Sequence, residues 1–400
     1  MENYFRAGNI MLPKACDYQK WSVIACDQHT SEPEYWENVR NYIGNAPSTI
    51  HMFFPEADLH KVGEDLFEQL SSYMQTLLED NFYNCYPNSY VYVERTLANG
   101  VIRQGIIGVV DLEYYDYAPK PTTKIFATEA TVLQRVPPRI ALRKRSCMEF
   151  SHTVMFCDDK DKSIIEPLYT AKKQLTQLYD FDLMTDGGHI AGYLLSGKEA
   201  ETFERKISKY EAENVYLVGD GNHSLVTAKL SYESLKETHP DIDWKNHPAR
   251  YAMVELENIN SDAMVFEPIY RIAVSESAEA MLDDFVKMDN ATGIPIAWSY
   301  GSRTGTVRLP VNDGKLPIEA LQRFLDEWLE THSGSVDYIH GSDTVKKLSQ
   351  NKNTIGFLQP DFDKTILFPY ILSGKVMPKK TFSIGHAEEK RYYLEGRKIR

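Results

Sequence analysis

The sequence predicts a mixed α/β protein with two parts, a core domain over residues 1–272 and a smaller α/β lobe over residues 273–400. Short apolar runs of strand length alternate with segments in which apolar residues recur every three or four positions, as in strands that alternate with helices. The chain has 400 residues, more than one hydrophobic core usually serves. A change in composition near residues 273–277 marks the start of the second part, and the C-terminal tail is expected to return to the core.

The composition excludes several classes of protein. With 42% hydrophobic and 25% charged residues, the chain has the composition of a globular domain rather than a disordered one. Its formal net charge of −13 argues against nucleic-acid binding, because phosphate backbones require a basic surface. Five cysteines occur without a C-x-x-C pair, which indicates reduced thiols. No apolar run approaches the ~20 residues of a membrane span. We therefore expect a cytoplasmic protein with no nucleic-acid or membrane partner.

The first predicted strand, residues 21–26, leads into a polar loop that contains Asp27 and His29. Open α/β sheets place their ligands at the carboxyl ends of strands, so both residues are site candidates. The alternative is that polar side chains of this loop cap the helix predicted over residues 33–42.

The next predicted elements are a helix and a hairpin that support the fold and contribute no site residues. Apolar residues at helical spacing predict one long amphipathic helix over residues 57–78. Two β-rich runs, residues 90–95 and 101–110, flank Asn99-Gly100 and predict an antiparallel hairpin with a two-residue turn.

A basic stretch follows Glu129. Guanidinium groups bind phosphate or carboxylate through two parallel hydrogen bonds, so this stretch is a candidate anion site, and the alternative is a basic surface facing water. Pro137-Pro138 predicts an extended backbone, which would disperse the arginines so that only some can converge. The arginines are Arg135, Arg139, Arg143 and Arg145.

The next elements are predicted from the same patterns. His189 precedes an apolar strand over residues 190–195 and is either a second ligand contact or an ordinary hydrogen-bonded histidine. The other expected strands of the core are residues 151–157, 215–218 and 251–256, with a helix over residues 167–179. The second lobe is expected to contain strands 307–309, 336–340 and 354–358, and helices 278–286, 318–331 and 343–350.

The stretch of strongest chemical character follows the strand at residues 215–218. It reads Gly219-Asp220-Gly221-Asn222-His223-Ser224 and is followed by a helical pattern. Glycines allow a sharp turn, and Asp220 or Asn222 is expected to cap the helix. The backbone N–H groups at such a helix start form an anion site, usually for phosphate. The alternative is an ordinary strand-to-helix connection with a good cap.

This loop resembles the Ala-Asp-Gly-His-His-Arg signature of DUF1015, a family of unknown function. Asn222 replaces the first histidine and Ser224 the arginine. Thr128-Glu129-Ala130-Thr131 resembles the family's His-Glu-x-Thr, and Pro268-Ile269-Tyr270-Arg271 its Pro-x-His-Arg. The tail at residues 374–382 resembles Met-Pro-Pro-Lys-Ser-Thr, and residues 25–31 resemble a clostridial-type branch of the family.

The loop is also similar to the phosphate loop of the ParB and sulfiredoxin superfamily. Members of that superfamily hydrolyse CTP, use ATP to reduce a sulfinic acid, or phosphorylate free serine with ADP. The resemblance implies a ParB/sulfiredoxin-like core and a nucleotide such as ADP or ATP. Three family histidines are replaced here, so a histidine-based metal centre is not expected, whereas Asp220 and Glu129 suit Mg²⁺.

The resemblance implies a phosphotransferase or another nucleotide-using enzyme acting on an amino-acid-sized substrate such as serine or phosphoserine. The alternatives are a nucleotide-switched binding protein that dimerises on its ligand, and a hydrolase that uses no nucleotide. The expected catalytic residues are His223, Asp220 and Asp27. The expected contacts to phosphate or substrate are Gly219, Gly221, Asn222, Ser224, His29, Glu129, Arg135, Arg139, Arg143, His189, Glu267, Arg271 and Lys379.

Overall fold

The structure, a computed structural model, describes residues 3–30, 32–118, 122–129, 136–150, 153–310 and 316–400. The chain forms two compact units. Unit 1 contains Met1–Met264 and Ala387–Arg400, and unit 2 contains Val265–His386. Both are mixed α/β, which confirms the predicted fold class. The boundary predicted at residue 273 falls inside strand β14 (Phe266–Val274) of unit 2.

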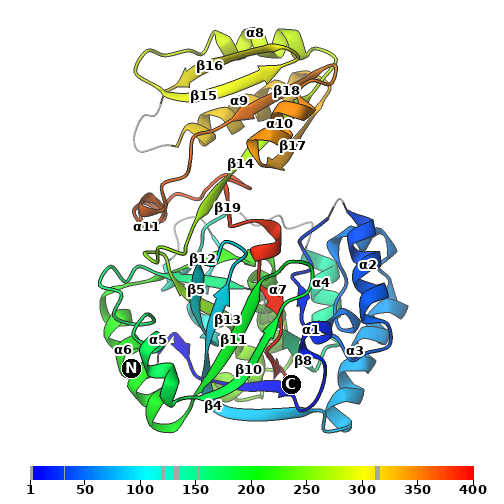
Figure 1. The fold of residues 1–400 in the computed structure, drawn as a ribbon, viewed down its shortest axis with the longest axis vertical. Helices are drawn as coiled ribbons and strands as arrows, with labels where there is room; N and C mark the ends of the chain where they lie inside the picture. Colours follow the sequence, from blue (N-terminus) through cyan, green and yellow to red (C-terminus); the bar gives the residue numbers. More distant parts are fainter. Residues whose placement is uncertain (1–2, 31, 119–121, 130–135, 151–152, 311–315) are drawn as a thin grey trace. The chain divides into compact units, whose positions relative to one another are not determined.

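Unit 1 is built on a large mixed sheet, drawn in Figure 1. Strands β6, β7 and β12 run parallel to one another, as do β9 and β13, and the other pairs are antiparallel. The spatial order is β6 (Tyr115–Asp116), β7 (Ile125–Ala127), β12 (Tyr216–Asp220), β9 (Val154–Cys157), β13 (Tyr251–Asn258), β5 (Ile102–Asp111), β4 (Tyr83–Thr96), β2 (Gly8–Pro13), β21 (Gly396–Lys398) and β8 (Met148–Phe150). Branching from it are β1 (Phe5–Arg6) on β5, and β11 (His189–Leu195) between β4 and β10 (Thr176–Asp182). A separate pair joins β3 (Val23–Ile24) to β20 (Tyr392–Tyr393).

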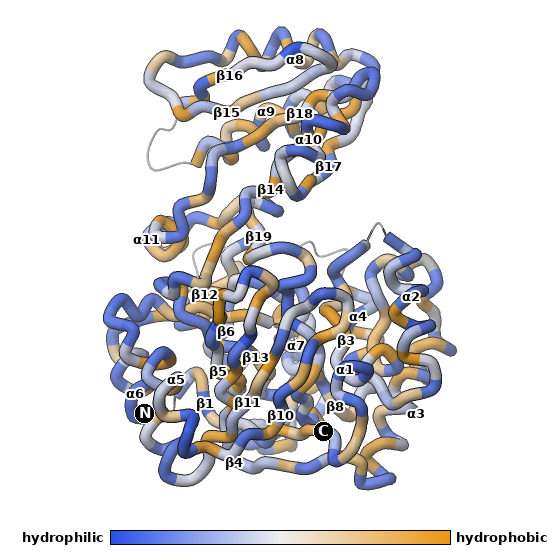
Figure 2. The backbone as a smooth tube through the Cα atoms, in the orientation of Figure 1, coloured by the Kyte–Doolittle hydropathy of each residue, from blue (hydrophilic) through white to orange (hydrophobic). Residues whose placement is uncertain are grey.

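Helices cover both faces of this sheet because the side chains of a strand alternate between faces. On β4, Tyr90 and Tyr92 belong to the core under α6 (Gly197–Glu213) and α7 (Asn222–Thr238). Val91 and Val93 belong to the core under α2 (Pro33–Ile43) and α3 (Glu64–Glu79). In Figure 2 α2 and α3 alternate between hydrophilic and hydrophobic positions, as expected for helices with one face on a core. The shorter helices are α1 (Tyr18–Trp21), α4 (Val136–Arg143) and α5 (Leu168–Ala171).

Unit 2 has the predicted strands and helices of a small α/β lobe. Its core contains Phe285, Leu321 and Phe357. The sheet order is β16 (Arg303–Leu309), β15 (Ile294–Tyr300), β18 (Thr354–Leu358), β14 and β17 (Ser335–His340), with β19 (Phe382–Ile384) beside β14. The helices are α8 (Ala278–Val286), α9 (Pro317–Thr331), α10 (Ser342–Leu348) and α11 (Leu367–Leu372). Among all helices of the described residues, none is long and apolar enough to cross a membrane.

Several local predictions are wrong. The strand predicted over residues 21–26 is reduced to β3, since Trp21 is the last residue of α1. The helix predicted over residues 57–78 is interrupted at Gly63, whose extended backbone separates a 3₁₀ helix (Glu56–Lys61) from α3. The helix predicted over residues 167–179 ends early, because residues 176–182 pair with β11 as strand β10 and tertiary pairing overrides helical propensity. The β4–β5 hairpin pairs Thr96 with Ile102, so its loop is longer than a two-residue turn.

The stretch around Pro137-Pro138 is helical, not extended. Both prolines lie in the first turn of α4, where the missing N–H groups have no helical partner to lose. As a result Arg139 and Arg143, four residues apart, lie on one face of a helix instead of being dispersed.

Candidate functional site

The Gly219 to Ser224 loop connects β12 to α7 through a left-handed residue. Gly221 has φ +76° and is the N-cap of α7, with no side-chain cap. The predicted capping by Asp220 or Asn222 is therefore wrong: Asp220 Oδ1 accepts the N–H of Gly221 at 2.9 Å instead. A Cβ at Gly221 would lie 2.8 Å from Thr153 Cα, so glycine is required here for both backbone conformation and space. The first turn of α7 thus presents backbone N–H groups without a side-chain cap.

A lysine from the C-terminal segment reaches this loop. Lys390 is 8% exposed, and its Nζ lies 3.0 Å from Asp220 Oδ2. Sequence reasoning missed Lys390 and proposed Lys379 instead. No local sequence pattern identifies Lys390, because its contact with Asp220 depends on how the C-terminal segment packs within unit 1. The loop therefore combines a helix start with an ammonium group, both favourable for an anion.

Glu129 and Thr153 lie at the same edge of the sheet as Asp220. Strands β7 and β12 are parallel with Ala127 opposite Val218, so Glu129 and Asp220 leave the sheet at the same end. Thr153 directly precedes β9, whose first residue pairs with Asp220. Glu129 is half-buried.

The geometry of Asp220 does not fit the predicted Mg²⁺. One carboxylate oxygen accepts a backbone N–H, and the other contacts the Lys390 ammonium, which occupies the place of a cation. In the part of the chain that the structure describes, no group of three or more His, Cys, Asp or Glu side chains is arranged to hold a metal ion. The expectation of Mg²⁺ on Asp220 and Glu129 is not supported by this arrangement.

The arginines of α4 are engaged in ion pairs. Arg139 pairs with Glu56, and Arg143 Nη1 lies 2.6 Å from Glu149 Oε2. Arg145 pairs with the exposed Glu64, and Arg135 lies outside the described residues. The expectation that one of these arginines replaces the missing loop arginine stays a prediction.

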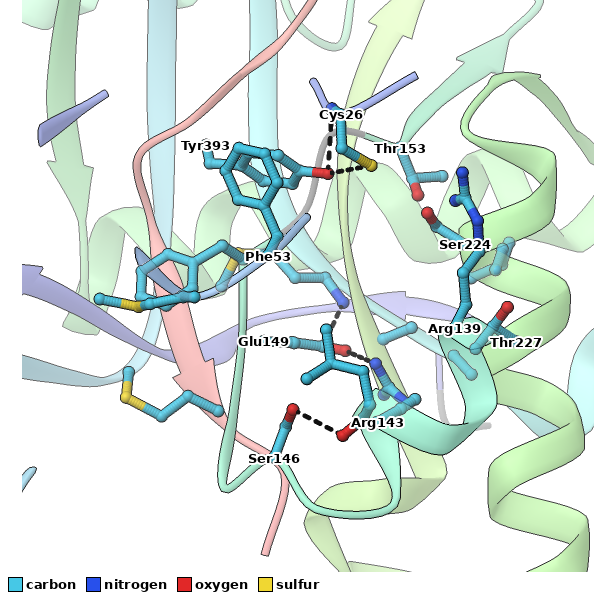
Figure 3. A pocket seen from close by; sticks show the side chains of 18 of the residues that line it. Cys26, Phe53, Arg139, Arg143, Ser146, Glu149, Thr153, Ser224, Thr227 and Tyr393 are labelled. Atoms are coloured by element: carbon cyan, nitrogen blue, oxygen red, sulfur yellow. Dashed lines mark hydrogen bonds and ion pairs between the residues drawn. The ribbon is translucent and has the colours of Figure 1, made fainter. Parts of the chain in front are cut away.

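Arg139, Arg143 and Ser224 line one cavity of about 150 Å³. Figure 3 shows Thr153, Ser224 and Arg139 on one side of it and Phe53 with Tyr393 on the other. Asp220 and Glu129 are not among the lining residues. Sequence reasoning missed several of its polar residues: Cys26, Ser146, Glu149, Thr153, Thr227 and Tyr393.

Asp27 contributes to the electrostatic surroundings of Arg139, which lines this cavity. Burial opposes the charge of Arg139, but the nearby carboxylates of Glu56 and Asp27 favour it, and the pKa of the guanidinium is raised. Burial raises the pKa of Cys26 to about 11, so its thiol is neutral and not a nucleophile. Asp27 thus belongs to the electrostatic environment of α4.

The other predicted histidines have separate surroundings. His29 has φ +49° and stacks on Tyr35 with ring centroids 3.7 Å apart. His189 lies on the β10–β11 hairpin, 2.8 Å from Asp182 and 2.6 Å from Asp180. His223 lies in the first turn of α7, and its carbonyl accepts the Thr227 hydroxyl at 2.7 Å. Neither His29 nor His189 lines the cavity.

Three predicted residues belong to unit 2. Glu267 and Arg271 lie on β14, and the fully buried Arg271 donates to the carbonyls of Lys379 and Lys380 at 3.0 and 2.8 Å. Lys379 itself lies over the ring of Tyr338. These bonds join β14 to the segment around Lys379 within unit 2, and the predicted ligand contact of Arg271 stays a prediction.

A buried charge cluster, formed by residues of β5, β13 and the C-terminal segment, was not predicted. Arg391 Nε is 3.0 Å from Glu255 Oε2, and Arg103 Nε is 3.5 Å from Glu257 Oε1. Glu257 is 1% exposed, and burial raises its pKa to about 7. Such perturbed carboxyl groups are frequent at functional sites and also occur in structural networks.

Comparison with solved structures finds distant similarities. A free serine kinase in complex with AMP is 11% identical with a TM-score of 0.40, covering 73% of this chain and 91% of that one. A conserved hypothetical protein from Pyrococcus furiosus is 11% identical with a TM-score of 0.35, covering 72% and 90%. C-terminally truncated SbnI from Staphylococcus aureus is 11% identical with a TM-score of 0.37, covering 70% and 83%. No curated protein matches the sequence.

The family comparison covers most of the chain. The family described as "Protein of unknown function (DUF1015)" matches residues 11–370, which include the β12–α7 loop and the stretch around Glu129. The chain therefore belongs to the DUF1015 family, as its motifs predicted.

Proposed function

We propose that the protein is a cytoplasmic phosphotransferase, or another nucleotide-using enzyme, that acts on a small amino-acid-like substrate such as serine. One observation carries the proposal: the uncapped start of α7 lies beside the Lys390 ammonium, which Asp220 holds at 3.0 Å. Backbone N–H groups at a helix start and a nearby ammonium are groups that bind phosphate. A ParB/sulfiredoxin-like core around β12 and α7 is part of the proposal.

Phosphoryl transfer depends mainly on positioning and charge neutralisation. In the proposal, the first turn of α7 and Lys390 bind the phosphate of an ADP- or ATP-like nucleotide. Asn222 Oδ1 is buried and makes no hydrogen bond to a described group, so it is suited to accept a hydrogen bond from a ligand hydroxyl. Asp27 and His223 are the proposed proton acceptors. No step is assigned to Mg²⁺, since Lys390 already contacts the Asp220 carboxylate.

The test incubates the purified full chain with ADP, ATP or CTP, with and without serine, and follows phosphoserine and phosphate by ³¹P NMR and mass spectrometry. We expect a phosphorylated product only when nucleotide and acceptor are both present. His223→Ala is expected to lower the rate by roughly 10²–10⁴, the usual effect of losing a catalytic base, with the melting temperature within a few degrees of the parent.

Other outcomes separate the alternatives. Nucleotide binding without product would favour a nucleotide-switched binding protein. Phosphate release from a phosphoester without nucleotide would favour a hydrolase. Absence of nucleotide binding at millimolar concentration, together with absence of product, would overturn the proposal.

A further inference from the structure

The cavity between α4 and α7 has mainly apolar walls. It measures about 150 Å³ and lies within unit 1. Its apolar side includes Met52, Phe53, Met74, Met148, Leu225 and Met253. Methionine side chains adapt to ligands of irregular shape. A dry cavity of ~150 Å³ holds a benzene ring, so the ligand body has about five or six carbon atoms.

The charges at one wall of the cavity do not balance. Glu149 accepts from Arg143 at 2.6 Å and from Arg397 at 2.8 Å, so two guanidinium groups share one carboxylate. The side chains of Arg143, Arg397 and Glu149 are 15%, 5% and 9% exposed. Burial lowers the pKa of Arg397. The negative charge of Glu149 opposes this shift, and the positive charge of Arg143 adds to it. A buried positive charge without a matching anion is costly, which favours an anionic ligand.

Arg143 also has an unused donor. Its Nη2 is buried and makes no hydrogen bond to any group that the structure describes, although Arg143 itself lines the cavity. Buried guanidinium N–H groups are nearly always hydrogen-bonded. A carboxylate oxygen of a ligand is an acceptor that would satisfy this N–H group.

Hydroxyl groups line the side of the cavity that α7 forms. Thr227 donates to the His223 carbonyl at 2.7 Å, so its oxygen still has lone pairs that can accept. Ser224 belongs to the first turn of α7, which joins this cavity to the loop after β12. Figure 3 shows Ser224 and Thr227 on the same helix, next to Arg139.

We propose that this cavity binds a small monocarboxylate with a compact apolar body, whose carboxylate accepts from Arg143 Nη2 and whose body lies against the methionines. The excess positive charge and the unused Arg143 donor favour a ligand with a carboxylate. The apolar walls and the cavity volume favour a small apolar body on that ligand. Whether the bound acid is the phosphoryl acceptor rests on the proposed function, whereas its binding does not.

The experiment measures binding to the full chain by calorimetry without nucleotide. The probes are benzoate and 4-methylpentanoate, with benzamide and 4-methylpentanamide as neutral counterparts of the same shape. We expect the acids to bind at least about tenfold more tightly than the amides, since a charge-assisted hydrogen bond replaces a neutral one. Ala228→Leu fills the cavity from α7 and is expected to abolish binding, whereas Ala212→Leu on the exposed face of α6 is the matched control and leaves it unchanged.

Arg143→Lys keeps a cation for Glu149 but removes the guanidinium donor, so we expect acid binding to weaken about tenfold with the fold retained. The inference is overturned if the acids do not bind at millimolar concentration, if acids and amides bind equally, or if Ala228→Leu binds like the parent. Failure of acid binding with intact nucleotide binding would contradict this inference alone. The reverse result would contradict the proposed function alone.

Discussion

The Lys390 ammonium lies 3.0 Å from Asp220 Oδ2, although 170 residues separate the two in the chain. Their side chains are 10% and 22% exposed, so the pair is largely removed from water. Arg95 donates to the carbonyl of Lys390 at 2.8 Å and fixes the backbone from which the lysine extends. The C-terminal segment is thereby joined by a charged contact to the loop that precedes α7.

Replacing Lys390 should affect both stability and ligand binding. Lys390→Gln removes a hydrogen bond between charged groups, and we expect a loss of about 1.5–3 kcal/mol in the free energy of unfolding. Affinity for a nucleotide should fall about tenfold or more. Urea denaturation and nucleotide titration measure the two effects, with Lys398→Gln, an exposed lysine on β21, as control. Unchanged affinity in Lys390→Gln would remove Lys390 from the site.

Gly221→Ala should destabilise more than the same change at Gly100. Both glycines have positive φ, +76° and +80°, a backbone conformation that costs an alanine about 1–2 kcal/mol. At Gly221 the new Cβ also lies 2.8 Å from Thr153 Cα, whereas nothing lies within 4 Å at Gly100. Unfolding free energies of the two variants should therefore differ, with Gly221→Ala lower, and equal values would argue against the close approach of Thr153.

Glu257 should make stability dependent on pH. Burial raises its pKa to about 7 in the folded protein, against a usual value of 4.5. Its contribution to stability is therefore fully present below about pH 4.5 and is lost as the pH rises through 7. Neither carboxylate oxygen accepts a hydrogen bond from a described group, so glutamine keeps the shape of the side chain and loses only the charge that faces Arg103 at 3.5 Å. Between pH 4.5 and 8 the parent should lose stability relative to Glu257→Gln, and a constant difference would contradict the raised pKa.

His189 should contribute stability at low pH. Burial disfavours its charged form, but hydrogen bonds to Asp182 and Asp180 outweigh this and raise its pKa. A raised histidine pKa contributes stability that is fully present below the usual value of 6.5 and is lost as the pH rises through the folded value. The parent should exceed His189→Gln in melting temperature at pH 5.5, and the difference should shrink by pH 9. His239→Gln, at an exposed histidine, is the control and should show a smaller pH dependence.

Much of the local structure followed from periodicity. The second lobe contains the predicted helix over 278–286 and strand over 354–358 with the same bounds, because side-chain burial repeats with the period of each element. The strand before Gly221 and the helix after it were also predicted, although β12 extends to Asp220 and so includes two residues that were expected in the loop. The errors lie where long-range pairing or a helix start overrides local preference, as in β10 and α4.

The sequence by itself determined the mixed α/β class, the membership of the DUF1015 family and the presence of a helix start in the Gly219 to Ser224 loop, because these depend on residues adjacent in the chain. Only the tertiary structure decided which charges meet. It brings Lys390 to Asp220, and it pairs Arg143 and Arg397 with Glu149, which lines the same cavity as Ser224. These contacts join segments far apart in sequence, and their geometry depends on how strands and helices pack, which no local spacing encodes.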